Sequence, residues 1–197
     1  MNPSQLEAVL GWASRGRVDS FQRADLEGAN LRGIDLGPGG RESGVNLGFA
    51  NLRQADLSEA ILTKANLQWA ILSWADLQGA DLGYADLQRA NLRCAKLRGA
   101  DVRHANLEAA ELRHAELPGA NVSYARLKRA DLFSANLRGA QLQYANLREA
   151  NLVSADLQEA DLWCADLQGA KVTPEQLAQA ADLTGAIMPD GARHEQE

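Results

Sequence analysis

The sequence predicts an all-β solenoid, and three observations support that prediction. A leucine, or in a few places a valine, recurs at every fifth position over most of the 197 residues. Alanine stands two residues before almost every one of these positions, and Asp or Asn usually stands directly before it. The period of five matches neither an α-helix, which repeats near 3.6 residues, nor a flat strand, which repeats every two. We therefore expect short extended segments separated by turns.

The repeat covers about three quarters of the chain. Three units occupy residues 24–38, six residues interrupt the pattern at 39–44, and 26 further units run without a break over 45–174. The central residue is Leu in 26 of these 29 units and Val in the other three, which indicates that this position is buried. Residues 19–23, centred on Phe21, resemble a further, degenerate unit.

Alternation along an extended segment decides which side chains point inward. The central residue and the alanine two residues before it share one side of the segment, and mostly polar residues occupy the outward positions. On an α-helix the same leucines would be spread around the whole circumference and would form no core. Representative core residues are therefore Leu52, Leu57, Leu77, Leu82, Leu87, Leu92, Ala75, Ala80 and Ala85.

The unit Ala-Asp-Leu-X-X, as in Ala75-Asp76-Leu77-Gln78-Gly79, resembles the motif of the pentapeptide-repeat family, a bacterial and often cyanobacterial family. The resemblance implies a right-handed quadrilateral β-helix, in which four units close one coil. The chain would then form about 7.5 coils and, at the ~4.8 Å spacing of paired strands, a rod of roughly 36 Å. Residues 20 apart in the sequence would be neighbours on adjacent coils.

A solenoid exposes its core at both ends, so we expect a short helical cap at each end. Near the start, Ser4 and Glu7 form a capping box ahead of apolar residues at helical spacing. At the far end, Thr173 and Pro174 begin a second helix, and Gln176 completes its capping box. This second helix is expected to continue at helical spacing through Leu177, Ala180, Leu183 and Ile187.

These features divide the chain into three parts. An N-terminal helical cap is expected over residues 1–18, the β-helix over 19–174, and a C-terminal helical cap and tail over 175–197. The Gly-rich, polar segment 39–44 is expected to be an exposed loop at a corner of the coil. It is either a tolerated insertion or a loop that contacts a partner.

Aromatic residues at intervals of 20 predict rows of rings on the surface. Such rows either stiffen the coil by stacking or form a contact surface for a protein partner or a second copy of the chain. One row, at a corner, also contains Lys64 and Cys164; a second row holds two rings, and two more rings lie on a third side. The candidate interaction residues are Tyr84, His104, Tyr124 and Tyr144 in the first row, Phe49 and Trp69 in the second, and Trp74 and Phe133 on the third side.

The chain contains no pattern typical of catalysis or of a bound cofactor. It has no phosphate-binding loop and no metalloprotease or serine-hydrolase motif, and bonds to nearby backbone explain the regular Asp and Asn residues. Cys94 and His114 are 20 residues apart, but a metal site needs a third good ligand and a catalytic pair needs a cleft. We therefore expect no enzyme activity, no cofactor, no metal, and a narrow, filled interior without a pocket.

Charge and targeting signals narrow the possible partners. No secretory signal or membrane span is visible and the two cysteines suggest no disulfide framework, so a cytoplasmic protein without membrane contact is expected. The formal net charge is −6, but residues 89–148 carry a net charge of +6 and the remainder −12. Nucleic-acid binding by this basic segment is not expected, because acidic residues flank it and aromatic residues are poorly interleaved with it.

Two functions are consistent with these features. The first is a rigid, non-enzymatic scaffold for a protein partner of unknown identity. The second follows from the resemblance, because some family members are DNA mimics that bind DNA gyrase and give quinolone resistance or toxin immunity. The rod and the acidic net charge fit a DNA mimic, whereas the basic segment 89–148 and the use of Leu where those proteins often have Phe do not. The scaffold is the principal hypothesis, and gyrase modulation is the alternative.

Overall fold

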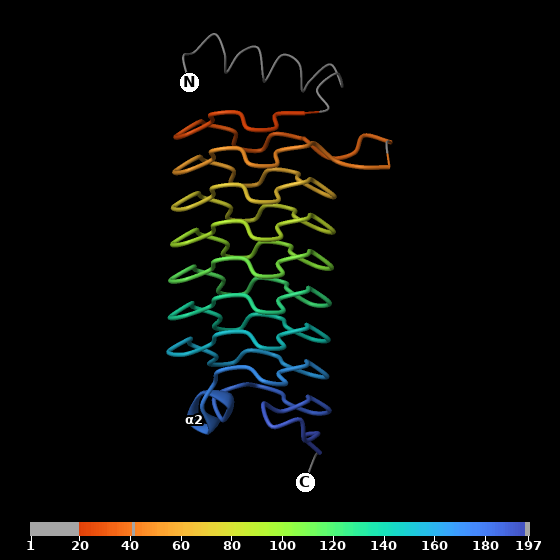
Figure 1. Ribbon diagram of the computed structural model, residues 1–197, viewed down its shortest axis with the longest axis vertical. Coiled ribbons are helices and arrows are strands. Elements are labelled where there is room, and N and C mark those ends of the chain that lie inside the picture. The colour runs from red at the N-terminus through yellow and green to blue at the C-terminus, as the bar shows by residue number, and fades with distance from the viewer. Residues whose placement is uncertain (1–19, 41, 196–197) are drawn as a thin grey trace.

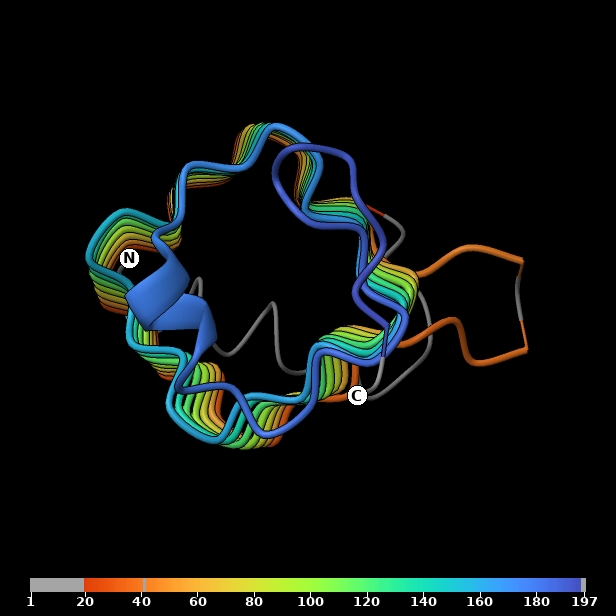
Figure 2. The ribbon, with the colours of Figure 1, turned by 90° about the horizontal axis from the view of Figure 1, so that it is seen from below.

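The chain winds into a solenoid of stacked parallel coils in the computed structural model, which describes residues 20–40 and 42–195 (Figure 1). Isolated parallel β-bridges join residues 20 apart, from Asn46 and Asn66 at one end to Asn151 and Lys171 at the other. Four five-residue units therefore close one coil, and the view along the axis shows a four-sided outline (Figure 2). The predicted N-terminal cap, residues 1–18, lies outside the described residues.

Backbone hydrogen bonds explain why the unit has five residues. In the unit centred on Leu82, the Leu82 N–H donates to Asp101 O on the next coil at 2.7 Å, and the Asp81 N–H donates to Ala60 O on the previous coil at 2.9 Å. The Ala85 N–H closes the turn by donating to Leu82 O at 2.9 Å. Each side of the coil is thus one extended segment and one turn.

The Asp or Asn before the central residue has a structural role in this turn. In the same unit the Gly83 N–H donates to the Asp81 Oδ1 at 2.9 Å. In the equivalent unit on the next coil, the Arg103 N–H donates to the Asp101 Oδ1 at 3.0 Å. The amide directly after the central residue is the only one in the unit for which the described backbone supplies no acceptor. Buried or half-buried amides need a partner, so the side-chain oxygen supplies it.

The core is a single column of leucine and alanine side chains. The nine representative residues have no exposed surface: Leu52, Leu57, Leu77, Leu82, Leu87, Leu92, Ala75, Ala80 and Ala85. Phe21 takes the central position of an additional unit at the N-terminal end, where its side chain is buried and its N–H donates to Asn46 O at 2.6 Å. The residues around Phe21 therefore continue the repeat beyond its clear sequence pattern.

The six-residue insertion leaves the coil at one corner. Asp35 pairs with Ile61, 26 residues away instead of 20, so the insertion is excluded from the coil and the register resumes after it. Gly39 and Gly40 are exposed, and the loop projects from the solenoid (Figure 2). Pro38, where the loop begins, occupies the same repeat position at the same corner as Tyr84.

The C-terminal end is covered by the short helix α2, Pro174–Leu177. The Thr173 Oγ1 accepts a hydrogen bond from the Gln176 N–H at 3.3 Å, and the Gln176 Oε1 accepts one from the Thr173 N–H at 3.1 Å, which completes a capping box. The Gln176 Nε2 donates to Leu152 O and Ala155 O, both at 2.8 Å. Gln176 therefore satisfies Ala155 O, which has no donor on a further coil among the described residues, and adds a second donor to Leu152 O, which already accepts from the Ala155 N–H at 2.9 Å.

The prediction that this helix continues through Leu183 and Ile187 is wrong. Helix α2 ends at Leu177, and residues 181–190 return to the repeat, with Asp182 paired to Asp161 across 21 residues. The Asp182 Oδ1 accepts from the Thr184 N–H at 2.7 Å, and Gly185 has a φ of 70°, so Ala-Asp-Leu-Thr-Gly folds as a repeat unit. The helical spacing of the apolar residues is coincidental.

Across the described residues, no helix combines the length and the apolar character that crossing a bilayer requires.

Candidate interaction surface

Three phenol rings and one imidazole form a continuous stack at one corner of the solenoid. The ring centroids lie 4.6 Å apart for Tyr84 and His104, 4.9 Å for His104 and Tyr124, and 4.8 Å for Tyr124 and Tyr144, with interplanar angles of 8° to 16°. These spacings match that of adjacent β-segments, so the coil itself holds the rings in contact. The three tyrosines remain 59%, 49% and 41% exposed. We call these four residues the tyrosine ladder.

Trp163 extends the tyrosine ladder by one ring. Its indole meets Tyr144 edge to face, with centroids 4.9 Å apart and planes at 72°. Burial raises the pKa of the Tyr144 phenol above its ordinary value of 10.0, so this hydroxyl stays protonated at neutral pH. Trp163 was not predicted because it stands one position earlier in its unit than the tyrosines, although the 20-residue interval indicates its place on the next coil.

A shallow hollow of about 490 Å³ lies beside the C-terminal half of the tyrosine ladder. The hollow is lined by aromatic side chains, by the amides of two glutamines, by two carboxylates and by a serine that is only 7% exposed. We call it the aromatic hollow. Its lining residues are Ser123, Tyr124, Gln141, Gln143, Tyr144, Asp161, Trp163 and Asp182.

The two carboxylates of the aromatic hollow are held by neutral donors. The Asp161 Oδ2 accepts from Gln143 Nε2 at 2.6 Å, and the Asp161 Oδ1 accepts from the Trp163 N–H at 3.0 Å. Hydrogen bonds from Thr184 hold the pKa of Asp182 below its ordinary value of 3.8. Within residues 20–40 and 42–195, neither carboxylate forms an ion pair. The hollow therefore carries negative charge that no lysine or arginine of the described chain pairs with; His194 makes a smaller contribution to the low pKa of Asp182.

The tyrosine ladder and the aromatic hollow belong to one side of the coil. This side, which we call the tyrosine face, is formed by the units centred on Leu82, Val102, Val122, Leu142 and Leu162, and the unit of Leu183 extends it. The chain leaves each of these units at the corner that carries the tyrosine ladder. The chain enters these units at the opposite corner, which carries no aromatic rings.

Glycines occupy the corner where the chain enters the first four units of the tyrosine face, and the exposed Glu159 takes this position before the unit centred on Leu162. The fifth residue of nearly every unit adopts a left-handed conformation, the exceptions being Pro38 and Pro174, and at the other corners residues such as Arg89 and Cys94 do so with φ of 57° and 56°. The backbone therefore does not restrict this corner to glycine, and there is open space beside Gly99, Gly119 and Gly139. The result is a smooth edge opposite the aromatic one. We call Gly79, Gly99, Gly119 and Gly139 the glycine corner.

The second predicted row of rings is covered by the chain's own arginines. Phe49 and Trp69 stack with centroids 6.2 Å apart and planes at 5°. The guanidinium of Arg23 lies 5.6 Å from the Phe49 ring and that of Arg89 lies 4.8 Å from the Trp69 ring. We call Arg23, Phe49, Trp69 and Arg89 the arginine-capped ladder. Both ends of this stack have cation–π partners within the chain.

The rings on the third side are not brought together. Trp74 is highly exposed, and three coils separate it from Phe133. Phe133 is instead packed by the Arg113 guanidinium at 4.7 Å and by the edge of the His114 ring at 5.8 Å. Cys94 is a free, half-buried thiol. Among the described residues no three His, Cys, Asp or Glu side chains gather as a metal site would require.

The basic segment 89–148 forms no single positive patch. Arg89, Arg93 and Arg98 belong to successive units and so lie on different sides of the coil. Many of the cations are also paired with carboxylates: Arg103 with Asp101 at 2.6 Å, Arg126 with Glu108 at 3.2 Å, and Arg129 with Glu149 at 2.7 Å. The hydrogen bond from Arg129 lowers the pKa of Glu149. The excess of positive charge in the sequence is therefore largely balanced locally.

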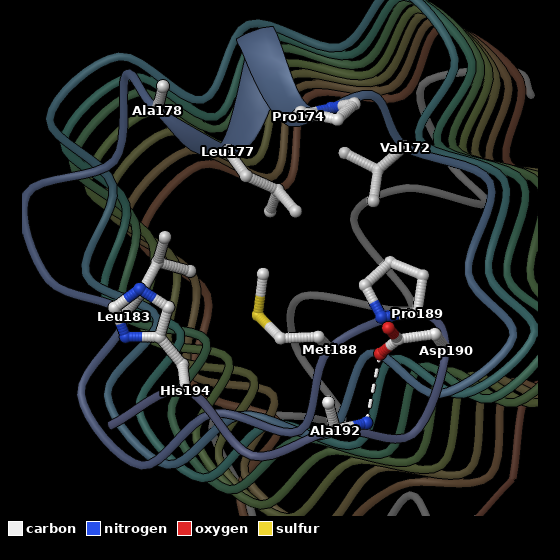
Figure 3. A pocket seen from close by; sticks show the side chains of 10 residues that line it. All are labelled: Val172, Pro174, Leu177, Ala178, Leu183, Met188, Pro189, Asp190, Ala192 and His194. Atoms are coloured by element: carbon white, nitrogen blue, oxygen red, sulfur yellow. Dashed lines mark hydrogen bonds between the residues drawn. The ribbon is translucent and has the colours of Figure 1, made fainter. Parts of the chain in front are cut away.

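A second hollow, of about 510 Å³, lies at the C-terminal end of the solenoid (Figure 3). The side chains of Leu177, Leu183 and Met188 point into it from α2 and from the units that follow α2 (Figure 3). His194 lies at its edge, and the buried Nδ1 of His194 has no hydrogen-bond partner among the described residues. No pocket was predicted, because the interior of the coils is filled; this hollow arises where α2 and the last units close the core incompletely.

The fold and this surface define a class of protein: a β-helical repeat protein with a filled interior and an exposed row of aromatic rings. A family model for pentapeptide repeats matches eight copies over residues 43–78, 70–108, 95–132 and 135–173. The chain belongs to the pentapeptide-repeat family, as the resemblance in its sequence indicated. Solved members of the family are right-handed quadrilateral β-helices, in agreement with the four-sided coil seen here.

Solved structures show how similar the chain is to individual members. HetL, a pentapeptide repeat protein involved in heterocyst differentiation regulation from the cyanobacterium Nostoc sp. strain PCC 7120, is 34% identical with a TM-score of 0.68, over 98% of this chain and 100% of HetL. The protein alr5209 from the same cyanobacterium is 29% identical with a TM-score of 0.32, over 91% of this chain and 93% of its own. QnrB1, a plasmid-mediated fluoroquinolone resistance protein, is 19% identical with a TM-score of 0.43, over 87% of this chain and 94% of QnrB1. The last two likenesses do not bear on function. Comparison with curated proteins found no match.

Proposed function

We propose that the chain is a non-enzymatic scaffold that binds a protein partner through its tyrosine face. The observation that carries this proposal is the tyrosine ladder, in which four rings are stacked yet the tyrosines remain exposed. Tyrosine is enriched at protein interfaces, where it combines apolar area with a polar hydroxyl. Because the coil already orders these rings, binding would cost little side-chain entropy.

A binding role agrees with the rest of the molecule. The interior is filled by leucine and alanine, and the repeated Asp and Asn side chains accept hydrogen bonds from their own turns, which leaves few groups for chemistry. HetL, similar over nearly the whole chain, is involved in the regulation of heterocyst differentiation. This similarity supports a regulatory role. In our proposal the chain acts in the cytoplasm and its partner is a protein.

Site-specific photo-crosslinking in cells tests the proposal. A benzophenone amino acid would replace Tyr124 on the tyrosine ladder or, as a matched control, Ser154, an exposed residue at the same repeat position two corners away. We expect one discrete heterologous product from position 124 and none from position 154. Equal products from both positions, or none from any position of the tyrosine ladder, would contradict the proposal. A product linking two copies of the chain would replace it with a homodimer interface.

Modulation of DNA gyrase is the second candidate function, and the rod shape with a net charge of −6 favours it. The arginines of segment 89–148 reach all sides of the coil, which weakens the likeness to a uniformly acidic duplex. A supercoiling assay with purified protein, with and without a fluoroquinolone, separates the two functions. We expect no effect up to tens of micromolar protein, whereas inhibition or drug rescue at low micromolar protein would favour gyrase.

A further inference from the structure

The aromatic hollow combines rings without a cation and carboxylates without a counter-ion. The described chain places guanidinium groups on three surface rings, those of Phe49, Trp69 and Phe133. It places none on Tyr124, Tyr144 or Trp163, the rings that line the aromatic hollow. A positively charged group is therefore the kind of ligand that these rings and carboxylates together lack.

Ion pairs show the same contrast between the carboxylates of the aromatic hollow and those of the next side, although farther along the tyrosine face Asp101 does pair with Arg103. On the next side of the coil, Glu108, Glu149 and Asp166 each pair with an arginine. Asp161 and Asp182, in contrast, are held only by uncharged donors among the residues that the structure describes. Each carboxylate oxygen can accept two hydrogen bonds, so both groups retain unused acceptor capacity.

We propose that the aromatic hollow binds an arginine side chain from a cationic segment of the partner protein. A guanidinium is planar, so one of its faces can stack on Tyr144 or Trp163 while its edge donates two hydrogen bonds to a carboxylate. Asp161 lies beside Trp163 in the lining, which places an acceptor next to a ring. The inference rests on the proposed function, because it identifies the chemistry of the partner at the same surface.

The two edges of the tyrosine face indicate how such a segment would lie. The tyrosine ladder forms a raised aromatic edge, and the glycine corner, on the opposite edge, has open space beside Gly99, Gly119 and Gly139. An extended chain can therefore approach across the glycine corner and project its arginine toward the rings. The small side chain of Ser123, which is almost fully buried, leaves room for the arginine in the aromatic hollow.

Fluorescence anisotropy with a labelled peptide of alternating arginine and serine tests this inference on the full chain. The comparison peptide replaces arginine with citrulline, which has the same shape but no charge. The test variant is the double substitution Asp161→Asn and Asp182→Asn. The matched control is Asp25→Asn and Asp76→Asn, which removes the same charge at the same repeat position on other sides. Asn is common at this position, so both variants should fold.

We expect the test variant to weaken binding of the arginine peptide at least about tenfold, and the control to change it less than about twofold. The citrulline peptide should bind at least about tenfold more weakly than the arginine peptide. Equal weakening by both double variants would show that only the overall charge matters and would overturn the inference, as would equal binding of the two peptides. If position 124 still crosslinks to a partner in that case, the proposed function stands and only its arginine chemistry fails.

Discussion

The tyrosine ladder and the arginine-capped ladder occupy neighbouring corners and are built from the same repeat position. Their backbones are alike, with φ of 59° at both Tyr84 and Trp69, and both present exposed rings one coil apart. They differ in what lies at the ends of the stack. Arg23 and Arg89 cover the outer rings of one ladder, whereas the other ends in a hollow with unpaired carboxylates. The coil thus dictates stacking, while the surrounding charges decide whether a stack is available to a partner.

The largest expected effect on stability comes from truncating a buried leucine below each ladder. Leu142→Ala lies in the unit of Tyr144, and Leu67→Ala lies in the unit of Trp69; both leucines are fully buried. Each substitution should lower the free energy of unfolding by about 2–5 kcal/mol, measured by urea denaturation, because it opens a cavity in the same leucine column. A much larger loss at one site would show that the two corners do not rest on equivalent cores.

An intermediate effect separates stacking from binding. Tyr124→Ser removes two ring contacts and should lower stability by about 1–3 kcal/mol, and Trp69→Ser removes one stack and one cation–π contact and should cost about 1–2 kcal/mol. Calorimetric titration with the crosslinked partner should show an affinity loss of about tenfold or more only for Tyr124→Ser. Tyr124→Phe, which keeps the ring, serves as the control. If Trp69→Ser weakened binding as much, the comparison between the two ladders would fail.

The smallest expected effect concerns the ion pairs beside each ladder. A hydrogen bond from Arg103 holds the pKa of Asp101, on the tyrosine face, below its ordinary value of 3.8. A hydrogen bond from Arg129 likewise holds the pKa of Glu149 below its ordinary value of 4.5. Because the folded-state pKa is depressed, this stabilisation is present above the unfolded value and is lost as the pH falls through the folded value. Both ion pairs lie at the surface, where solvent screens them, so each contributes little to the free energy of unfolding.

Carbon-detected NMR titration would measure both carboxyl groups in one experiment. Arg103→Gln should return the pKa of Asp101 toward 3.8 and leave that of Glu149 low, and Arg129→Gln should do the reverse. A pKa of Asp101 that does not move in Arg103→Gln would show that burial and backbone, and not the guanidinium, set its titration.

The repeat made much of this structure predictable from the sequence. The interval of 20 residues identifies the partners of Tyr84 and Trp69 because backbone hydrogen bonds set the coil length, and the period of five identifies the buried leucines. The return of Leu183 to the repeat was not predicted, since one extra residue shifts its register to 21 and the apolar spacing happens to match a helix. The positions of Arg23 and Arg89 over rings were not predictable either, because long side chains have many rotamers that the period does not restrict.

Gln176 has a consequence for how such proteins change in length during evolution. Each coil offers the next one the same donors and acceptors, so a stack contains no information about how many coils it should have. On one side of the coil, the amide of Gln176 ends the series by donating to the carbonyls of Leu152 and Ala155, while residues 181–190 continue the repeat on the next two sides. A gene duplication or deletion of one 20-residue block upstream would leave that terminus intact. A solenoid built in this way can therefore gain or lose reach in steps of one coil while it keeps the same C-terminal end.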